Sequence, residues 1–87
     1  MTLQPLKEKL EAVPGLSVSE RGTGKAKFLY VRSPVRAAEV SVEVDGLLIE
    51  YWDEADEESD KGSVNREMVA SDSVALANIK QWLFASS

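Results

Sequence analysis

The sequence predicts an α+β fold: a two-layer sandwich in which an antiparallel four-stranded meander carries the N- and C-terminal helices on one face, in the order α-β-β-β-β-α. Three observations predict it. Apolar residues recur at helical spacing near both ends of the sequence, as in amphipathic helices. Between them, alternating apolar and polar runs are separated by short turns, which is typical of consecutive antiparallel strands. Asp45-Gly46 lies between two such runs and is a strong hairpin signal. We expect residues 1–87 to form a single small domain.

The first helix is predicted to begin at Leu3 and to end at Pro14-Gly15. Thr2 is the expected N-cap, because its hydroxyl can accept a hydrogen bond from an amide of the first turn. The apolar residues of this segment have the spacing of one buried stripe. They are Leu3, Leu6, Leu10 and Val13.

Two strands are predicted next, on either side of a glycine-rich turn. The first, Leu16 to Arg21, is short and makes a marginal strand. The second, Lys25 to Arg32, is rich in aromatic and β-branched residues, which favour strands. The residues of the second strand that we expect to face the core are Ala26, Phe28 and Tyr30. Those that we expect on the other face are Lys27, Leu29 and Val31.

The central hairpin is predicted to have Asp45-Gly46 as its whole loop, which sets Val44 opposite Leu47. The inner face is then wholly apolar and comprises Val40, Val42, Val44, Leu47, Ile49 and Tyr51. The outer face is mostly acidic and comprises Glu39, Ser41, Glu43, Leu48, Glu50 and Trp52. A slip of one residue would bury the glutamates, so the sequence specifies the two faces well.

The last strand and the second helix are predicted from the remaining apolar pattern. Ser63 to Ala70 returns antiparallel as an edge strand, with Val64, Met68 and Ala70 facing inward. The three residues Ser71-Asp72-Ser73 each suit an N-cap for a helix that runs to about Phe84. The apolar stripe of this helix comprises Ala75, Leu76, Ile79, Trp82 and Leu83.

Composition excludes several kinds of chemistry. The sequence has no cysteine and no histidine, so thiolate catalysis, cysteine metal sites and the commonest general base are all absent. We therefore expect a protein that is not an enzyme and that has no cofactor. No apolar run is long enough to span a membrane. A cytoplasmic protein with no membrane partner is the expectation that follows.

Charge is distributed unevenly along the chain. The net charge is −5, yet residues 1–38 carry seven Lys or Arg against three Glu, while residues 39–60 carry ten acids and no base. The acidic part would repel nucleic acid, so no nucleic-acid partner is expected. Asp53 to Asp60 lacks the glycine that a calcium-binding EF-hand loop requires. We expect a solvated acidic loop and no metal site, while the pattern leaves open whether this loop binds divalent cations.

The outer sheet face and the acidic loop together form the candidate site. In the expected register, exposed apolar side chains there are bordered by carboxylates, an arrangement typical of partner surfaces. The candidate partner-binding residues are Leu29, Val31, Glu39, Leu48, Glu50, Trp52, Glu54, Asp56 and Glu57. The alternative for Trp52 is that it packs against a neighbouring strand or loop instead of a partner.

The function predicted from this site is that of a non-enzymatic protein-binding module, with a basic protein as its partner. This layout, with terminal helices flanking an acidic antiparallel sheet, is similar to that of frataxins, of small secretion chaperones and of several toxin-immunity proteins. That resemblance implies one alternative, an immunity-type or chaperone-like inhibitor of a basic partner. A small enzyme that uses Asp and Glu or a divalent metal is a second alternative. The oligomeric state stays open, because an edge strand can also pair with a second copy.

Overall fold

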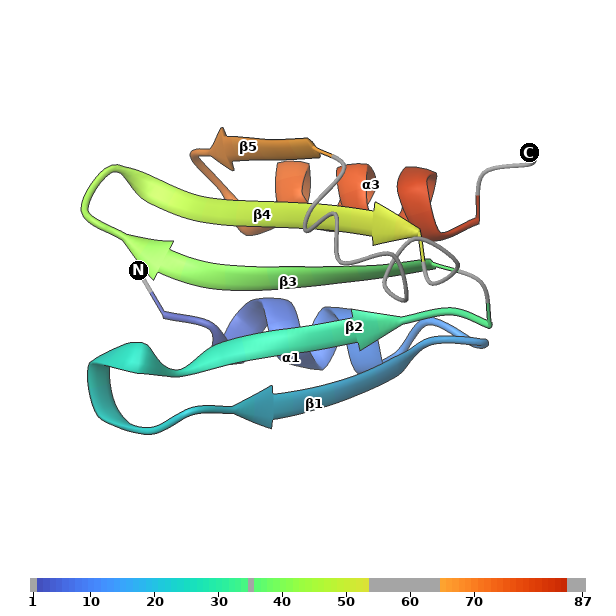
Figure 1. Ribbon diagram of the computed structural model, residues 1–87, viewed down its shortest axis with the longest axis horizontal. Helices are drawn as coiled ribbons and strands as arrows, with labels where there is room; N and C mark the ends of the chain where they lie inside the picture. Colours follow the sequence, from blue (N-terminus) through green and yellow to red (C-terminus); the bar gives the residue numbers. More distant parts are fainter. Residues whose placement is uncertain (1, 35, 54–64, 85–87) are drawn as a thin grey trace.

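The computed structural model of the protein describes residues 2–34, 36–53 and 65–84. Five strands form one antiparallel meander in the order β1-β2-β3-β4-β5, and both helices lie behind it (Figure 1). The elements are α1 (Gln4–Glu11), β1 (Ser17–Arg21), the 3₁₀ turn η1 (Gly24–Ala26), β2 (Phe28–Arg32), β3 (Arg36–Glu43), β4 (Gly46–Asp53), β5 (Asn65–Val69) and α3 (Asp72–Leu83). The predicted α+β sandwich is confirmed.

The sheet has five strands, whereas the predicted order counted four and left Leu16 to Arg21 as a marginal strand. The difference lies at β1, which pairs with β2 along its whole length, from Ser17 opposite Arg32 to Arg21 opposite Phe28. Only Val18 of β1 turns a partly buried apolar side chain toward the core. Backbone pairing with β2, which the sequence pattern does not reveal, is what makes this polar segment a strand.

The two helices cover one face of the sheet, α1 behind its β1–β2 half and α3 behind its β4–β5 half (Figure 1). Ser71 caps α3 as predicted, since its side chain accepts a hydrogen bond from the backbone N–H of Val74 at 3.3 Å. The predicted Thr2 cap is wrong: Leu3 occupies the N-cap position of α1, and no side chain caps that helix. Neither described helix has the length and apolar character that crossing a membrane requires.

The hydrophobic core fills the space between the sheet and the two helices. Its largest fully buried side chains are Leu6, Leu10, Leu29, Leu47, Ile49, Ile79, Val31 and Val40. Helix α1 contributes Leu6 and Leu10, and α3 contributes Ile79, as the apolar stripes predicted. A surface ion pair of 3.4 Å between Lys9 and Asp72 links the two helices at their solvent side.

Strand β2 presents the opposite face to the core from the one that we predicted. Leu29 and Val31 are fully buried, whereas Phe28 and Tyr30 lie on the outer face and are partly exposed. Tyr30 was predicted to share the core face with Val40, but the structure pairs Leu29 with Val40 and Tyr30 with Glu39. The backbone N–H of Ser33 bonds to the carbonyl of Arg36 at 2.9 Å, and this tight connection shifts the register by one residue. A shift of one residue exchanges the two faces of a strand.

The central hairpin turns one position earlier than predicted. Glu43 pairs with Gly46, so Val44 and Asp45 form the turn, and Val42 faces Leu47. This change moves every partner by two residues, which leaves the faces of β3 and β4 as predicted. Val44 is fully exposed in the turn and is not part of the core.

Strand β5 also turns the other face inward. Its register sets Leu47 opposite Val69 and Ile49 opposite Glu67. Val69 is buried, while Met68, predicted to face the core, is 48% exposed on the outer face. Glu67 is tolerated on the helix side because its carboxylate accepts hydrogen bonds there.

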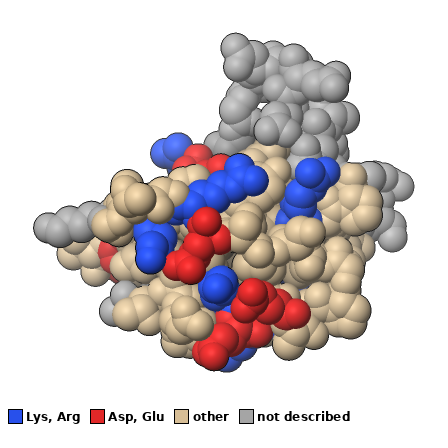
Figure 2. Space-filling view, turned by 90° about the horizontal axis from the view of Figure 1, so that it is seen from below, with Lys and Arg blue, Asp and Glu red and all other residues tan. Residues whose placement is uncertain are grey.

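The β1 edge of the sheet is covered by charged side chains of both signs (Figure 2). Glu20 of β1 forms ion pairs with Lys7 of α1 at 3.7 Å and with Lys27 at 3.3 Å. Lys27 was predicted to lie within the second strand, but it precedes β2 and pairs with Glu20. Charges along an edge strand disfavour pairing with further strands.

Candidate functional site

The outer sheet face, opposite the two helices, brings side chains of all five strands together. The registers place Tyr30, Glu39, Glu50 and Arg66 in one row across it. Phe28, Ser41, Leu48 and Met68 form the next row. Trp52 lies beside Ala37 in a third row. Apolar and charged residues therefore alternate across the face.

Five of these residues form what we call the outer apolar patch: Phe28, Tyr30, Leu48, Trp52 and Met68. Within this patch the rings of Tyr30 and Trp52 meet at a centroid distance of 6.0 Å and an interplanar angle of 57°. The guanidinium of Arg21 lies over the ring of Tyr30, 4.2 Å from its centroid. All five side chains keep part of their surface exposed.

One ion pair lies on the same face as the patch. Glu50 and Arg66, opposite one another on β4 and β5, form an ion pair of 3.2 Å.

The indole N–H of Trp52 is buried and has no hydrogen-bond partner among the residues that the structure describes. A buried donor without an acceptor costs about 1–3 kcal/mol, so Trp52 is not held there by optimal polar contacts.

The predicted site residues have three different outcomes. Glu39, Leu48, Glu50 and Trp52 lie on the outer face, each half-buried. Leu29 and Val31 do not belong to the site, because the one-residue shift of β2 buries both in the core. The remaining three, Glu54, Asp56 and Glu57, lie outside the described residues.

Sequence reasoning missed Phe28, Tyr30 and Met68 as members of this face. For Phe28 and Tyr30 the missing information was the length of the connection to β3. That length sets the register of β2 against β3, and therefore which face of β2 is buried. For Met68 a signal existed: Asn65, Glu67 and Val69 alternate in the sequence as a partly polar inner face. Arg66 already interrupts the inner face that was predicted for this strand, and hydrogen bonds to β4 and α3 allow Glu67 to lie on the helix side instead.

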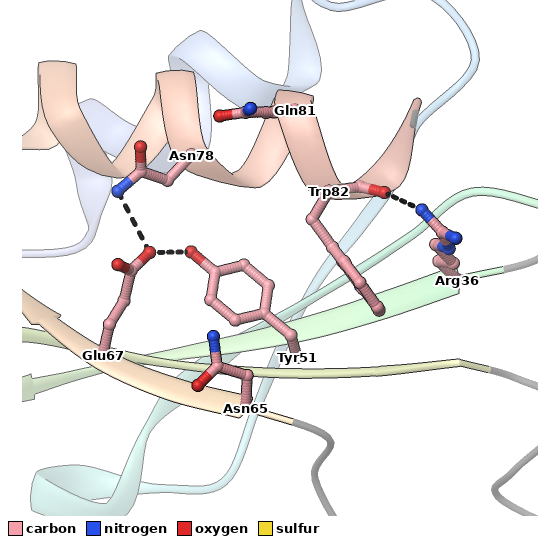
Figure 3. A pocket seen from close by; sticks show the side chains of 7 residues that line it. All are labelled: Arg36, Tyr51, Asn65, Glu67, Asn78, Gln81 and Trp82. Carbon is pink, nitrogen blue, oxygen red and sulfur yellow. Dashed lines mark hydrogen bonds between the residues drawn. The ribbon is translucent and has the colours of Figure 1, made fainter. Parts of the chain in front are cut away.

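A second feature lies on the opposite side of the sheet, where α3 meets β4 and β5 (Figure 3). This helix-side cleft has a volume of about 400 Å³ and opens to solvent. It is lined by Arg36, Tyr51, Asn65, Glu67, Asn78, Gln81 and Trp82. Every one of these side chains carries a polar group, in contrast with the outer apolar patch.

One end of the cleft is a hydrogen-bonded group around Glu67. Oε1 of Glu67 accepts from the hydroxyl of Tyr51 and, at 3.0 Å, from Nδ2 of Asn78. Burial raises the pKa of Tyr51 well above its usual range, and the hydrogen bond to Glu67 and its negative charge raise it further. The phenol therefore stays protonated and remains a donor to the carboxylate.

The other end of the cleft is built from Arg36 and Trp82. The guanidinium lies 4.3 Å from the centroid of the Trp82 ring, and its Nη1 donates to the backbone carbonyl of Trp82 at 3.0 Å. The indole N–H of Trp82 donates to the carbonyl of Ala37 at 3.2 Å. Tyr51 meets Trp82 edge to face at 5.9 Å, so two aromatic rings join the two ends.

The carboxylates of the described chain are dispersed among cations and hydroxyls. Glu50 is paired with Arg66, Glu20 with lysines, and Glu67 with Tyr51 and Asn78. Within the residues that the structure describes, no group of three or more acidic side chains is arranged to hold a metal ion.

No family model, no curated protein and no solved structure matches the chain. The function is therefore argued from the outer apolar patch and the helix-side cleft.

Proposed function

We propose that the protein is a non-enzymatic binding module that holds a protein partner on its outer sheet face. The observation that carries the proposal is the contact between Tyr30 and Trp52 within the outer apolar patch, on the face away from α1 and α3 (Figure 1). Tyrosine and tryptophan are enriched among the residues that dominate binding energies, because they bury a large area at a small entropic cost.

The surroundings of the patch suit a protein partner. Arg21 stacks on Tyr30, and the Glu50–Arg66 pair lies in the same row of the sheet. Charges at the border of an apolar centre fix the orientation of a partner more than they add affinity. The indole N–H of Trp52, which has no hydrogen-bond partner within residues 2–34, 36–53 and 65–84, is a further donor that a partner-induced rearrangement would satisfy.

The acidic residues that follow β4 suggest the charge of the partner. Six of the eight residues from Asp53 to Asp60 are acidic, so a partner with a basic surface would be attracted at low ionic strength. Glu54, Asp56 and Glu57 are the residues of this run that we assign to steering. A basic partner is compatible with an immunity-type or chaperone-like inhibitor. The acidic run itself would repel nucleic acid. A cytoplasmic location belongs to the same proposal and rests on the cysteine-free sequence.

Partner capture from the native lysate, followed by mass spectrometry, tests this proposal. Trp52→Ala should lose the specific partner while the protein stays folded by circular dichroism. Phe84→Ala is the matched control, because Phe84 is also a half-exposed aromatic residue, 49% exposed, but packs beside Gly15 away from the outer face. The control should retain the partner.

A second variant tests the same surface in case Trp52→Ala does not fold. Met68→Lys places a charge in the patch at a side chain that is already 48% exposed, so the fold should survive it. If Met68→Lys and Trp52→Ala are both folded and both capture the same partner as the wild type, the outer face is not the binding surface.

A further inference from the structure

The helix-side cleft has opposite charges at its two ends. Figure 3 shows Glu67 beside Asn78 at one end and Arg36 beside Trp82 at the other, with the ring of Tyr51 between them. The carboxylate is contributed by β5 and the guanidinium by β3, so the spacing of the charges is set by the sheet. The lining thus contains one carboxylate and one guanidinium, and such a site discriminates between ligands by where they carry their charges.

Both charged groups are held in place before any ligand arrives. Glu67 accepts two hydrogen bonds, from Tyr51 and Asn78, and both reach its Oε1 atom. Arg36 is fixed by the ring and the backbone carbonyl of Trp82. Charges that are already oriented lose little further freedom on binding, which favours affinity for a small ligand.

The walls between the two ends can form directional hydrogen bonds. Asn65, Asn78 and Gln81 each contribute a primary amide that both donates and accepts. The volume of about 400 Å³ lies within the range of small-molecule sites. The aromatic rings of Tyr51 and Trp82 provide apolar surface for a short carbon chain.

We propose that this cleft binds a small zwitterion, with its ammonium group at Glu67 and its carboxylate at Arg36. The amino acids and short ω-amino acids are the ligand class that carries these two groups on a compact chain. The site is separate from the outer sheet face, so this inference does not depend on the proposed protein-binding function.

The first experiment measures binding to the wild-type protein by nuclear magnetic resonance. The probes are glycine, β-alanine, γ-aminobutyrate, δ-aminovalerate and ε-aminocaproate, which separate the two charges by increasing numbers of methylene groups. Signals from the side-chain amides of Asn65, Asn78 and Gln81 and from the Trp82 indole should move. The Trp52 indole, on the other face of the sheet, is the internal control and should not move.

One length in this series should bind about tenfold more tightly than the acid or the amine that has the same chain and only one charge. For γ-aminobutyrate these half-charged analogues are butyrate and butylamine. Glucose tests for recognition by the amides alone. If no probe moves the cleft signals, or if glucose and the half-charged analogues bind as tightly as the best zwitterion, the proposal is wrong.

The second experiment removes each charge separately. Glu67→Gln keeps an acceptor for Tyr51 and Asn78, and should weaken binding of the zwitterion and the amine while leaving that of the acid unchanged. Arg36→Met keeps an apolar stem over Trp82, and should have the converse effect. Glu50→Gln, on the outer face, is the matched control and should change neither affinity.

Equal zwitterion affinity in the wild type and in a folded Glu67→Gln variant would show that the carboxylate is not the ammonium site. Should either variant fail to fold, the comparison of charged and half-charged probes on the wild-type protein decides the matter. Because Trp52→Ala leaves the cleft intact, loss of zwitterion binding and loss of the protein partner are separate results.

Discussion

Tyr51 shows how a single buried hydroxyl can link folding to pH. Its side chain is 4% exposed, it packs on Trp82, and its hydroxyl donates to Glu67. Ionisation of the phenol would place a second negative charge beside that carboxylate in a poorly solvated position. The folded state therefore binds the Tyr51 proton more tightly than the unfolded chain does, and the pKa is raised.

The raised pKa predicts a loss of stability at high pH. The unfolded chain releases the Tyr51 proton near its ordinary pKa of about 10, while the folded chain keeps it. The stabilisation is complete below about pH 10 and decreases as pH rises above that value. Tyr51→Phe should lower the free energy of unfolding at neutral pH by about 1–3 kcal/mol and should make the alkaline decrease smaller.

Urea unfolding of both proteins between about pH 7 and pH 11 measures these two effects. The difference between the two proteins isolates Tyr51 from other groups that titrate in the same range. If the variant loses as much stability above about pH 10 as the wild type does, Tyr51 is not the group responsible.

At the scale of the elements, Gly46 determines how closely β4 and β5 approach. Its φ is +147°, and a Cβ at this position would lie 2.3 Å from the carbonyl oxygen of Val69. The Asp-Gly pair marks the hairpin in the sequence, yet the glycine does not sit inside the two-residue turn. It is needed because the backbone of β5 passes where a side chain would begin.

Gly46→Ala should therefore lower the free energy of unfolding by about 2 kcal/mol or more, from a backbone clash together with strain at positive φ. Gly24→Ala is the matched control: its φ is +57°, but nothing lies within 4 Å of the added Cβ. Its cost should be about 1 kcal/mol, the conformational part alone. Thermal unfolding of the two variants measures the difference.

Equal destabilisation by the two alanines would mean that β5 moves aside without cost. In that event the close packing of β5 on Gly46 would not contribute to the stability of the β4–β5 pair.

At the scale of the whole molecule, the two helices that the structure describes both lie on the same face of the sheet (Figure 1). The same residue type consequently has different roles on β2 and β4, which lie on either side of β3. Leu29 of β2 is fully buried against the helices, whereas Leu48 of β4 lies half-buried in the outer apolar patch. Both were predicted to be exposed.

Leu29→Ala and Leu48→Ala provide a matched test of this arrangement. Leu29→Ala removes core contacts and should lower the free energy of unfolding by about 2–5 kcal/mol. Leu48→Ala should cost about 1 kcal/mol or less, because its side chain remains partly solvated in the folded state. Urea unfolding at neutral pH gives both values, and a reversed order would show that β2 presents its other face to the helices.

Much of the fold follows from local patterns. The stripe of α1 and the Ser71 cap of α3 predict the two helices, because helical spacing and capping act over a few neighbouring residues. The inner faces of β3 and β4 were predicted even though the turn lies one position earlier, since a two-residue change of partner preserves faces. The assignment of Leu29 and Val31 failed because face parity in β2 depends on the Ser33–Arg36 connection.

By itself, then, the sequence determined the α+β class, the antiparallel order of strands, both helices and the apolar inner face of the central hairpin. These properties arise from periodicity, capping and turn chemistry, which involve residues close together in the chain. The tertiary structure alone decided which face of β2 and β5 is buried and that Tyr51, Glu67 and Asn78 meet. Those outcomes depend on the register of each strand and on packing between segments that are distant in the sequence. A register shift of one residue moves every side chain of a strand from the core face to the surface face, or the reverse.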